Sequence, residues 1–163
     1  MQKALYDQYA PRMLAVCVRY SKNREDAEDI LQEAFVKVFN NMDKFRKEST
    51  LGYWIKRIVV NTALNYHRKS VYLYPHYDIE DMHHLGDDEV LVSNYNYRDL
   101  LNIIHSLPQG CQVIFNLYAI EGYKHKEIAE MLDISEGTSK SQYARAKSLI
   151  KEIITETGEV KHG

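Results

Sequence analysis

Apolar residues recur every three or four positions in three stretches of the first half of the chain: residues 2–20, 24–40 and 51–69. This period is that of an α-helix with one buried face. The apolar positions are Leu5, Tyr9, Met13, Val16, Cys17, Tyr20; Ala27, Ile30, Leu31, Ala34, Phe35, Val38; and Leu51, Trp54, Ile55, Ile58, Val59, Thr62, Ala63, Tyr66. The pattern predicts three amphipathic helices, and Pro11 predicts a kink in the first or a late start.

The second half of the chain shows the same period. We expect a helix over residues 95–106 and a second that starts at Leu107-Pro108, with proline in its first turn. The strongly apolar residues 112–120 continue that helix, and Glu121-Gly122 ends it. A later helix is expected to fray near Thr157-Gly158.

Residues 122–150 read as two helices joined by a very short turn. Asp133-Ile134-Ser135 interrupts the helical pattern, with Ile134 placed to fill the angle between the helices. Ser135 is a good N-cap, and Glu136 in the first turn suits the helix dipole. The buried stripes of the two helices are predicted to contain Ile128, Ala129, Leu132, Tyr143, Ala146 and Ile150.

The other face of the second of these helices is small, polar and basic. Its residues are Ser141, Ala144, Arg145 and Ser148, flanked by Thr138 and Lys140. A helix that enters the DNA major groove needs such a face. Two short amphipathic helices with a tight turn also occur where no DNA binds, and the modest basic charge does not decide between the two interpretations.

Residues 71–94 lose the helical period and predict a flexible acidic linker, with Pro75 and Gly86 as breakers. The fold class is therefore all-α, with two small helical domains at residues 1–70 and 95–163. A zinc site is one interpretation of the three histidines His76, His83 and His84. Adjacent histidines beside aspartates in a loop are weak evidence, however, and no metal site is predicted.

Charge is distributed unevenly along the chain. Residues 1–70 hold 13 Lys and Arg against 8 Asp and Glu, whereas residues 71–98 hold 1 against 6. A basic front half indicates a polyanionic partner. Its third predicted helix carries Lys56, Arg57, Asn61, Asn65 and Arg68 beside Tyr53, Trp54 and Tyr66, and the loop before it carries Lys44, Arg46 and Lys47. Cations with flat rings suit single-stranded or opening DNA, although the rings, Trp54 above all, also fit a core role.

The second predicted helix has an acidic patch within this basic domain. Asp29, Gln32 and Glu33 stand at helical spacing on one face. Such a patch is either a solvated surface or a docking face for a basic partner.

Composition sets the class of protein. The apolar content of 45% is that of a globular chain, and no apolar run reaches the roughly 18 residues of a membrane span. Cys17 and Cys111 lie in apolar helical runs, which predicts buried, reduced thiols. No signal peptide is recognised, so we expect an intracellular, cytoplasmic protein. No catalytic constellation, nucleotide loop or metal-ligand set is evident, so neither an enzyme nor a cofactor is predicted.

Three motifs, in order, resemble the extracytoplasmic-function (ECF) sigma factors of the sigma-70 family. They are DAEDILQEAF at 26–35, WIKRIVVNTALNYHRK at 54–69, and the stretch from LPQGCQ to YARAK at 107–147. The resemblance implies a transcription initiation factor that binds core RNA polymerase and promoter DNA. A helix-turn-helix alone would also fit a stand-alone DNA-binding regulator, which is the alternative.

The resemblance also implies roles for particular positions. Polymerase docking on the β′ clamp helices falls to Asp26, Asp29, Gln32 and Glu33. Reading and opening of the −10 element falls to Lys44, Arg46, Lys47, Tyr53, Lys56, Arg57, Asn61, Asn65 and Arg68. Reading of the −35 element falls to Lys124, Lys126, Thr138, Lys140, Ser141, Ala144 and Arg145. The β flap and an anti-sigma protein are the further partners implied.

Three positions depart from the family pattern. The family usually has an apolar residue at Ser139, often arginine at Gln142 and often glycine at Asp133. We expect Ser139 to make the seam between the two helices slightly polar, and Gln142 to remove a cation from the DNA interface.

Overall fold

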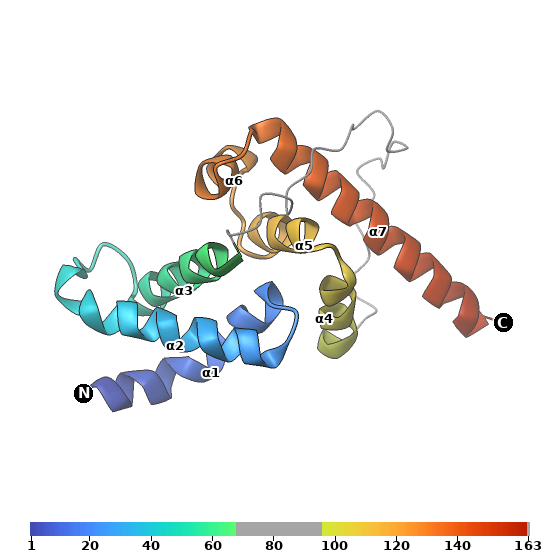
Figure 1. Ribbon diagram of the computed structural model, residues 1–163. Coiled ribbons are helices and arrows are strands. Elements are labelled where there is room, and N and C mark those ends of the chain that lie inside the picture. The colour runs from blue at the N-terminus through green and yellow to red at the C-terminus, as the bar shows by residue number, and fades with distance from the viewer. Residues whose placement is uncertain (68–95, 163) are drawn as a thin grey trace. The chain divides into compact units, whose positions relative to one another are not determined.

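The computed structural model describes residues 1–67 and 96–162, with side chains up to residue 66 and from 96 to 156 (Figure 1). Its contacts divide the chain into two compact units, residues 1–69 and 70–163. Every regular element in the described ranges is helical, which confirms the all-α prediction. The predicted linker lies outside these ranges. None of the described helices is long and apolar enough to span a bilayer.

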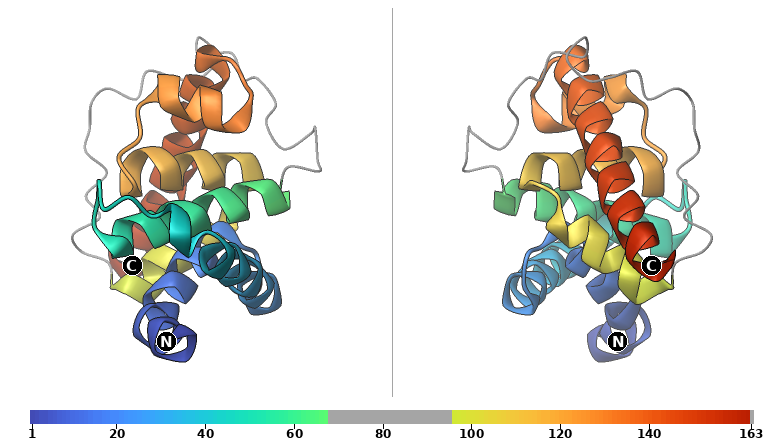
Figure 2. Two further views of the ribbon diagram at one scale, coloured as in Figure 1. Left: turned by 90° about the vertical axis from the view of Figure 1, so that its left-hand side faces the viewer. Right: turned by 90° about the vertical axis from the view of Figure 1, so that its right-hand side faces the viewer.

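Unit 1 is a three-helix bundle of α1 (Gln2–Tyr20), α2 (Arg24–Asn40) and α3 (Leu51–His67). Each of the three helices packs against the other two (Figure 2). The predicted stripes face inward, because helical spacing places them on one side of each helix. Side chains without measurable exposure are Cys17, Tyr20, Ala27, Ile30, Ala34, Val38, Ile55, Val59 and Ala63.

Pro11 neither kinks α1 nor delays its start, contrary to the prediction from the sequence. The helix begins at Gln2 and runs unbroken through Pro11 to Tyr20. Pro11 and Asp7 both lie on the exposed side, where water can bond the Asp7 carbonyl that the missing proline N–H leaves free. The solvated position therefore tolerates the proline.

Both cysteines are buried thiols that form no disulfide, as predicted. Burial raises the pKa of the Cys17 thiol to about 12. The thiolate, which is the reactive form, is therefore disfavoured, and Cys17 acts as a small core residue.

Unit 2 contains α4 (Tyr97–Ser106), α5 (Gln109–Phe115), the π-helical turn η5 (Asn116–Ile120), α6 (His125–Leu132) and α7 (Glu136–His162). Helices α5 and α6 pack on α7, as Figure 1 shows. A buried cluster joins α4, α5 and α7 through Ile103, Leu107, Cys111, Ala146 and Ile150.

Several boundaries in unit 2 differ from the prediction. Asn96 caps α4 by accepting a 2.9 Å hydrogen bond from the Asp99 amide, so α4 starts at Tyr97. Pro108 precedes α5 as its N-cap instead of lying in its first turn. The expected single helix over residues 112–120 changes to a π turn after Phe115. Helix α7 continues to His162, past Thr157-Gly158, where fraying was predicted.

The turn between α6 and α7 follows the prediction closely. The Ser135 hydroxyl accepts a 3.0 Å hydrogen bond from the Thr138 amide and so caps α7. Ile134 is half-buried at the angle, and its amide donates to the Ala129 carbonyl over 3.0 Å. Asp133 ends α6 in the left-handed region, with φ 55° and ψ 49°. This conformation explains why glycine would suit the position.

Replacing Asp133 by glycine should therefore stabilise unit 2. A left-handed L residue costs about 1–2 kcal/mol, and the extra backbone entropy of glycine takes back about 0.5–1 kcal/mol. We expect the free energy of unfolding of Asp133→Gly to rise by about 0.5–1 kcal/mol in urea titrations. The matched variant Asp133→Ala should be no more stable than the parent chain; equal gains for both variants would contradict this explanation.

Candidate functional site

The acidic patch of α2 is an exposed surface. Asp29, Gln32 and Glu33 all face solvent, and Glu33 forms only an exposed 3.4 Å ion pair with Lys37. Val36, one helical turn further on, leaves 58% of its surface exposed. Exposed pairs contribute little to stability. The carboxylates and the adjoining apolar residue are thus free of any large role in the fold.

Asp26 is placed differently from these three residues. It is half-buried, and both of its carboxylate oxygens accept hydrogen bonds within unit 1. Asn23 Nδ2 donates to Oδ2 over 3.1 Å, and the Tyr66 hydroxyl of α3 donates to Oδ1 over 3.0 Å. The bond to Asp26 raises the pKa of Tyr66. Asp26 therefore ties the start of α2 to α3.

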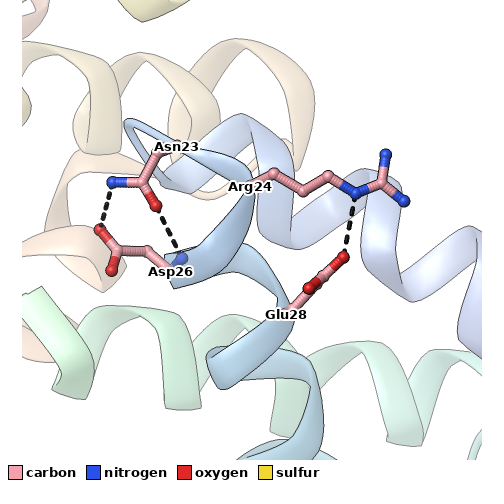
Figure 3. A network of polar contacts seen from close by, with 4 residues as sticks. All are labelled: Asn23, Arg24, Asp26 and Glu28. Atoms are coloured by element: carbon pink, nitrogen blue, oxygen red, sulfur yellow. Dashed lines mark hydrogen bonds and ion pairs between the residues drawn. The ribbon is translucent and has the colours of Figure 1, made fainter.

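The first turn of α2 shows how local sequence fixes this arrangement (Figure 3). Asn23 caps the helix by accepting a 2.8 Å hydrogen bond from the Asp26 amide. In the same turn, Arg24 Nε donates to Glu28 Oε1 over 2.9 Å, with both side chains exposed. The cap orients Asp26, whereas the Arg24–Glu28 pair is a surface contact.

The loop before α3 forms one side of a cleft. The short helix η1 (Met42–Lys44) opens the loop, and the rings of Phe45 and Trp54 lie 5.3 Å apart between their centres. The cleft has a volume of about 330 Å³, and its lining is Lys44, Phe45, Arg46, Glu48, Ser49, Tyr53, Trp54 and Arg57. Sequence reasoning assigned Trp54 to the core, but it is half-buried and lines this cleft. Cationic and aromatic side chains thus line the same cleft of unit 1.

Three of the predicted DNA residues lie along the same ridge of α3 as Tyr53. Tyr53, Arg57, Asn61 and Asn65 recur every fourth residue and are all exposed. Lys56 is half-buried and lies off this ridge. Arg46 and Lys47 are exposed in the loop, where Lys47 has a φ of 59°. Arg68 lies outside the described residues. The ridge and the cleft share Tyr53 and Arg57, which makes one continuous surface.

Most of the predicted DNA face of unit 2 is accessible. Lys124, Lys126 and Lys140 are exposed. Thr138, Ala144 and Arg145 are partly exposed on α7. Lys140 also forms an exposed 3.5 Å ion pair with Glu136, one turn earlier. The start of α6 and one side of α7 therefore present cations and small side chains together.

Ser141 is not on this face, which corrects the sequence prediction. Its side chain has no measurable exposure, and its Oγ donates a 3.1 Å hydrogen bond to the Thr138 carbonyl. A short hydroxyl side chain readily bonds to the preceding turn of its own helix. In this conformation Ser141 cannot contact DNA.

Gln142 is also misplaced by sequence reasoning. It is 1% exposed, and the Cys111 Sγ donates to its Oε1 over 3.1 Å. The position packs against α5, so glutamine here does not remove a cation from an exposed interface. Ser139, by contrast, does make the seam polar as predicted. It is fully buried, and its Oγ lies 2.8 Å from His125 Nδ1 at the start of α6.

A ring cluster beside this seam was missed by sequence reasoning. The rings of Tyr118 and His125 stack with centres 4.3 Å apart, and Tyr143 lies 4.5 Å from Tyr118. Lys147 Nζ lies 5.1 Å from the centre of the Tyr143 ring. Tyr143 was predicted to be buried but is half-buried. The π turn η5 carries Tyr118 into this cluster, and no helical period could have indicated it.

No group of His, Cys, Asp and Glu able to hold a metal occurs in the part of the chain that the structure describes. His76, His83 and His84 lie outside that part.

Comparison with known proteins matches each of the two units to a known protein family. The sigma-70 region 2 family matches residues 5–71, and the sigma-70 region 4 family matches residues 97–150. These two regions, in this order, define a protein of the sigma-70 class.

Relatives narrow the class. The ECF RNA polymerase sigma-E factor of Haemophilus influenzae is 32% identical over 159 residues, covering 90% of this chain and 84% of the relative. The sigma-E factor of Escherichia coli K12 is 29% identical over 154 residues, covering 87% and 80%. The chain belongs to the ECF sigma factors. It is thus a promoter-specific transcription initiation factor that acts with RNA polymerase.

Solved structures show the same fold. The sigma factor RpoE of Bartonella quintana, in complex with the anti-sigma factor NepR, matches with a TM-score of 0.58 at 20% identity, covering 94% of this chain and 96% of that one. CnrH, in complex with the cytosolic domain of CnrY, matches with a TM-score of 0.52 at 16% identity, covering 95% and 88%.

Proposed function

We propose that unit 1 joins the polymerase to the −10 element. The exposed face of Asp29, Gln32, Glu33 and Val36 docks on the β′ clamp helices. Asp26 supports that face from within the bundle, through Asn23 and Tyr66. The supporting observation is that the carboxylates of Asp29 and Glu33 stay exposed, while the opposite, apolar side of α2 is buried against α1 and α3.

The ridge and cleft of α3 provide the −10 surface in this proposal. Arg57, Asn61 and Asn65 contact the strand, with Lys56 and Arg68 as further cations. Tyr53, 52% exposed, offers a flat face for stacking. Lys44, Arg46 and Lys47 hold phosphates around the cleft. Stacking of one base on an aromatic ring is worth about 1–3 kcal/mol, which offsets the few kcal/mol that unstacking a base costs.

Unit 2 reads the −35 element in duplex DNA. Lys124 and Lys126 hold phosphates at the start of α6, while Lys140, Ala144 and Arg145 face the major groove with Thr138 beside them. Phosphate contacts position the helix and base contacts specify the sequence. The polymerase β flap and an anti-sigma protein bind the chain as further partners. The factor acts in the cytoplasm and performs no covalent step of its own.

Transcription with purified components tests this function. Core polymerase from Escherichia coli, the full chain and a duplex library with randomised promoter-length segments are combined, and the transcribed templates are sequenced. We expect run-off transcripts only with the chain present, from templates that share an upstream and a start-proximal element. A chain that never co-elutes with the core enzyme, or templates without any shared element, would refute the proposal.

A further inference from the structure

The seam between α6 and α7 contains the partly buried imidazole ring of His125. His125 is the first residue of α6, and Ser139 lies in the first turns of α7. Their 2.8 Å hydrogen bond joins the starts of the two helices. Ser139 is fully buried, while the next residue, Lys140, is exposed on the DNA face. Any shift at Ser139 is therefore transmitted directly to that face.

Stacking fixes the ring in its plane. Tyr118 of η5 stacks on His125 with an interplanar angle of 13°, and Tyr143 of α7 lies 5.7 Å away at 59°. Both η5 and α7 thus hold the imidazole of α6, η5 through the Tyr118 ring and α7 through the Tyr143 ring and the bond to Ser139. The arrangement resembles the supporting contacts that keep a binding residue in its productive geometry.

The charges around the ring favour its neutral form. Burial lowers the pKa of His125, Lys140 and Lys147 lower it further, and Glu136 opposes them. Lys124 and Lys126 flank the ring in sequence, and Tyr118 of η5 and Tyr143 of α7 are the titratable rings that contact it. A protonated ring would be a further cation, partly buried, beside lysines.

We propose that His125 is a positioning residue for −35 recognition: its neutral imidazole holds the start of α7 through Ser139, and recognition weakens when the ring is protonated. The proposal rests on the function proposed for unit 2. Because the pKa of His125 is lowered in the folded chain, the seam is at full strength above the ordinary histidine pKa of about 6.5 and weakens only at a pH below that value, where the folded ring takes up a proton. Below that pH both ring nitrogens carry protons, so Nδ1 no longer accepts from the Ser139 hydroxyl, and the charged ring is driven toward water.

The test measures discrimination by the complete complex of core polymerase and full chain. The probes are the duplex selected in the transcription experiment and a copy with its upstream element scrambled. The ratio of their affinities is measured from about pH 8 down to about pH 5.5, on either side of the histidine range. Binding to the start-proximal element alone, measured on the scrambled duplex, serves as the internal reference.

Two variants separate the bond from the charge. His125→Phe keeps a flat ring against Tyr118 but neither bonds to Ser139 nor titrates; Ser139→Ala removes the bond and keeps the titrating ring. We expect the parent chain to lose discrimination by about threefold to tenfold as the pH falls, which is the effect of one lost hydrogen bond. His125→Phe should show a similar loss already at about pH 8, with a flat profile below it.

Ser139→Ala should show the same loss at about pH 8, and it decides the bond's role if His125→Phe does not fold. His105→Gln, in the last turn of α4, is the matched control and should keep the parent's profile. Parallel profiles for His125→Phe and the parent chain would overturn the proposal. So would better discrimination at low pH, since it would mean that the imidazolium binds phosphate. If no variant and no pH gives discrimination of the upstream element, the assignment of unit 2 itself fails, and this proposal with it.

Discussion

Reversing the charge of the α2 face, in the double variant Asp29→Lys and Glu33→Lys, is expected to lower the affinity for core RNA polymerase by about a hundredfold. This corresponds to about 2.7 kcal/mol, because like charges brought together across an interface cost several kcal/mol. Both side chains are exposed, and the Glu33–Lys37 pair lost is a surface contact. The helical fold should therefore survive. Titration of fluorescently labelled chain with core enzyme gives the affinity, and circular dichroism verifies the fold.

The matched control lies on α7. Glu152 and Glu156 are exposed and have the same spacing, so Glu152→Lys with Glu156→Lys introduces the same charge change elsewhere. It should retain nearly the parent affinity. If both double variants weaken binding equally, net charge and not the α2 face governs the association.

Removing Arg145 should impair recognition of the upstream element. A side chain that contacts a base edge is worth about 1–3 kcal/mol of discrimination, so we expect Arg145→Ala to lose about tenfold to a hundredfold in preference for the selected duplex over one with a scrambled upstream element. Opening of the −10 region, followed by permanganate reactivity once the complex is bound at saturating concentration, should change little. The two readouts therefore separate recognition of the upstream element from opening of the strands.

Arg98→Ala is the control for this variant, because Arg98 is an exposed arginine of the same unit on α4. It should keep the preference of the parent chain. An Arg145→Ala chain with unchanged preference, or one that loses upstream preference and strand opening to the same extent, would contradict the orientation of α7 given above.

Local sequence determined most of the candidate surfaces as well as the helices. Asp29, Gln32 and Glu33 were expected on one exposed face because residues separated by one turn share a side of a helix, and they lie there. The cap at Ser135 was predicted from the same local chemistry. Docking and DNA contacts at these positions remain predictions, because they concern partners that neither the sequence nor the fold of this chain contains.

The errors concern which side chains the folded chain leaves exposed. Helical period placed Ser141 on the outer face, and the family resemblance placed Gln142 near DNA. The Ser141 hydroxyl instead bonds back to its own helix, and Gln142 contacts Cys111 of α5. Trp54 was predicted to be a core residue, but it lines a cleft together with Phe45 and the loop before α3. The exposure of a side chain depends on which residues of other helices pack against it, and the sequence of a single helix does not specify those residues.

The sequence by itself determined the all-α class, the three helices of unit 1, the turn between α6 and α7, and, through three motifs, the family. These features follow from period, caps and breakers, which act within a few residues. Only the tertiary structure decided that Asp26 binds Tyr66 across 40 residues, that η5 brings Tyr118 onto His125, and that His125 meets Ser139. Such contacts join separate helices, and their geometry is fixed by the packing of whole elements against one another.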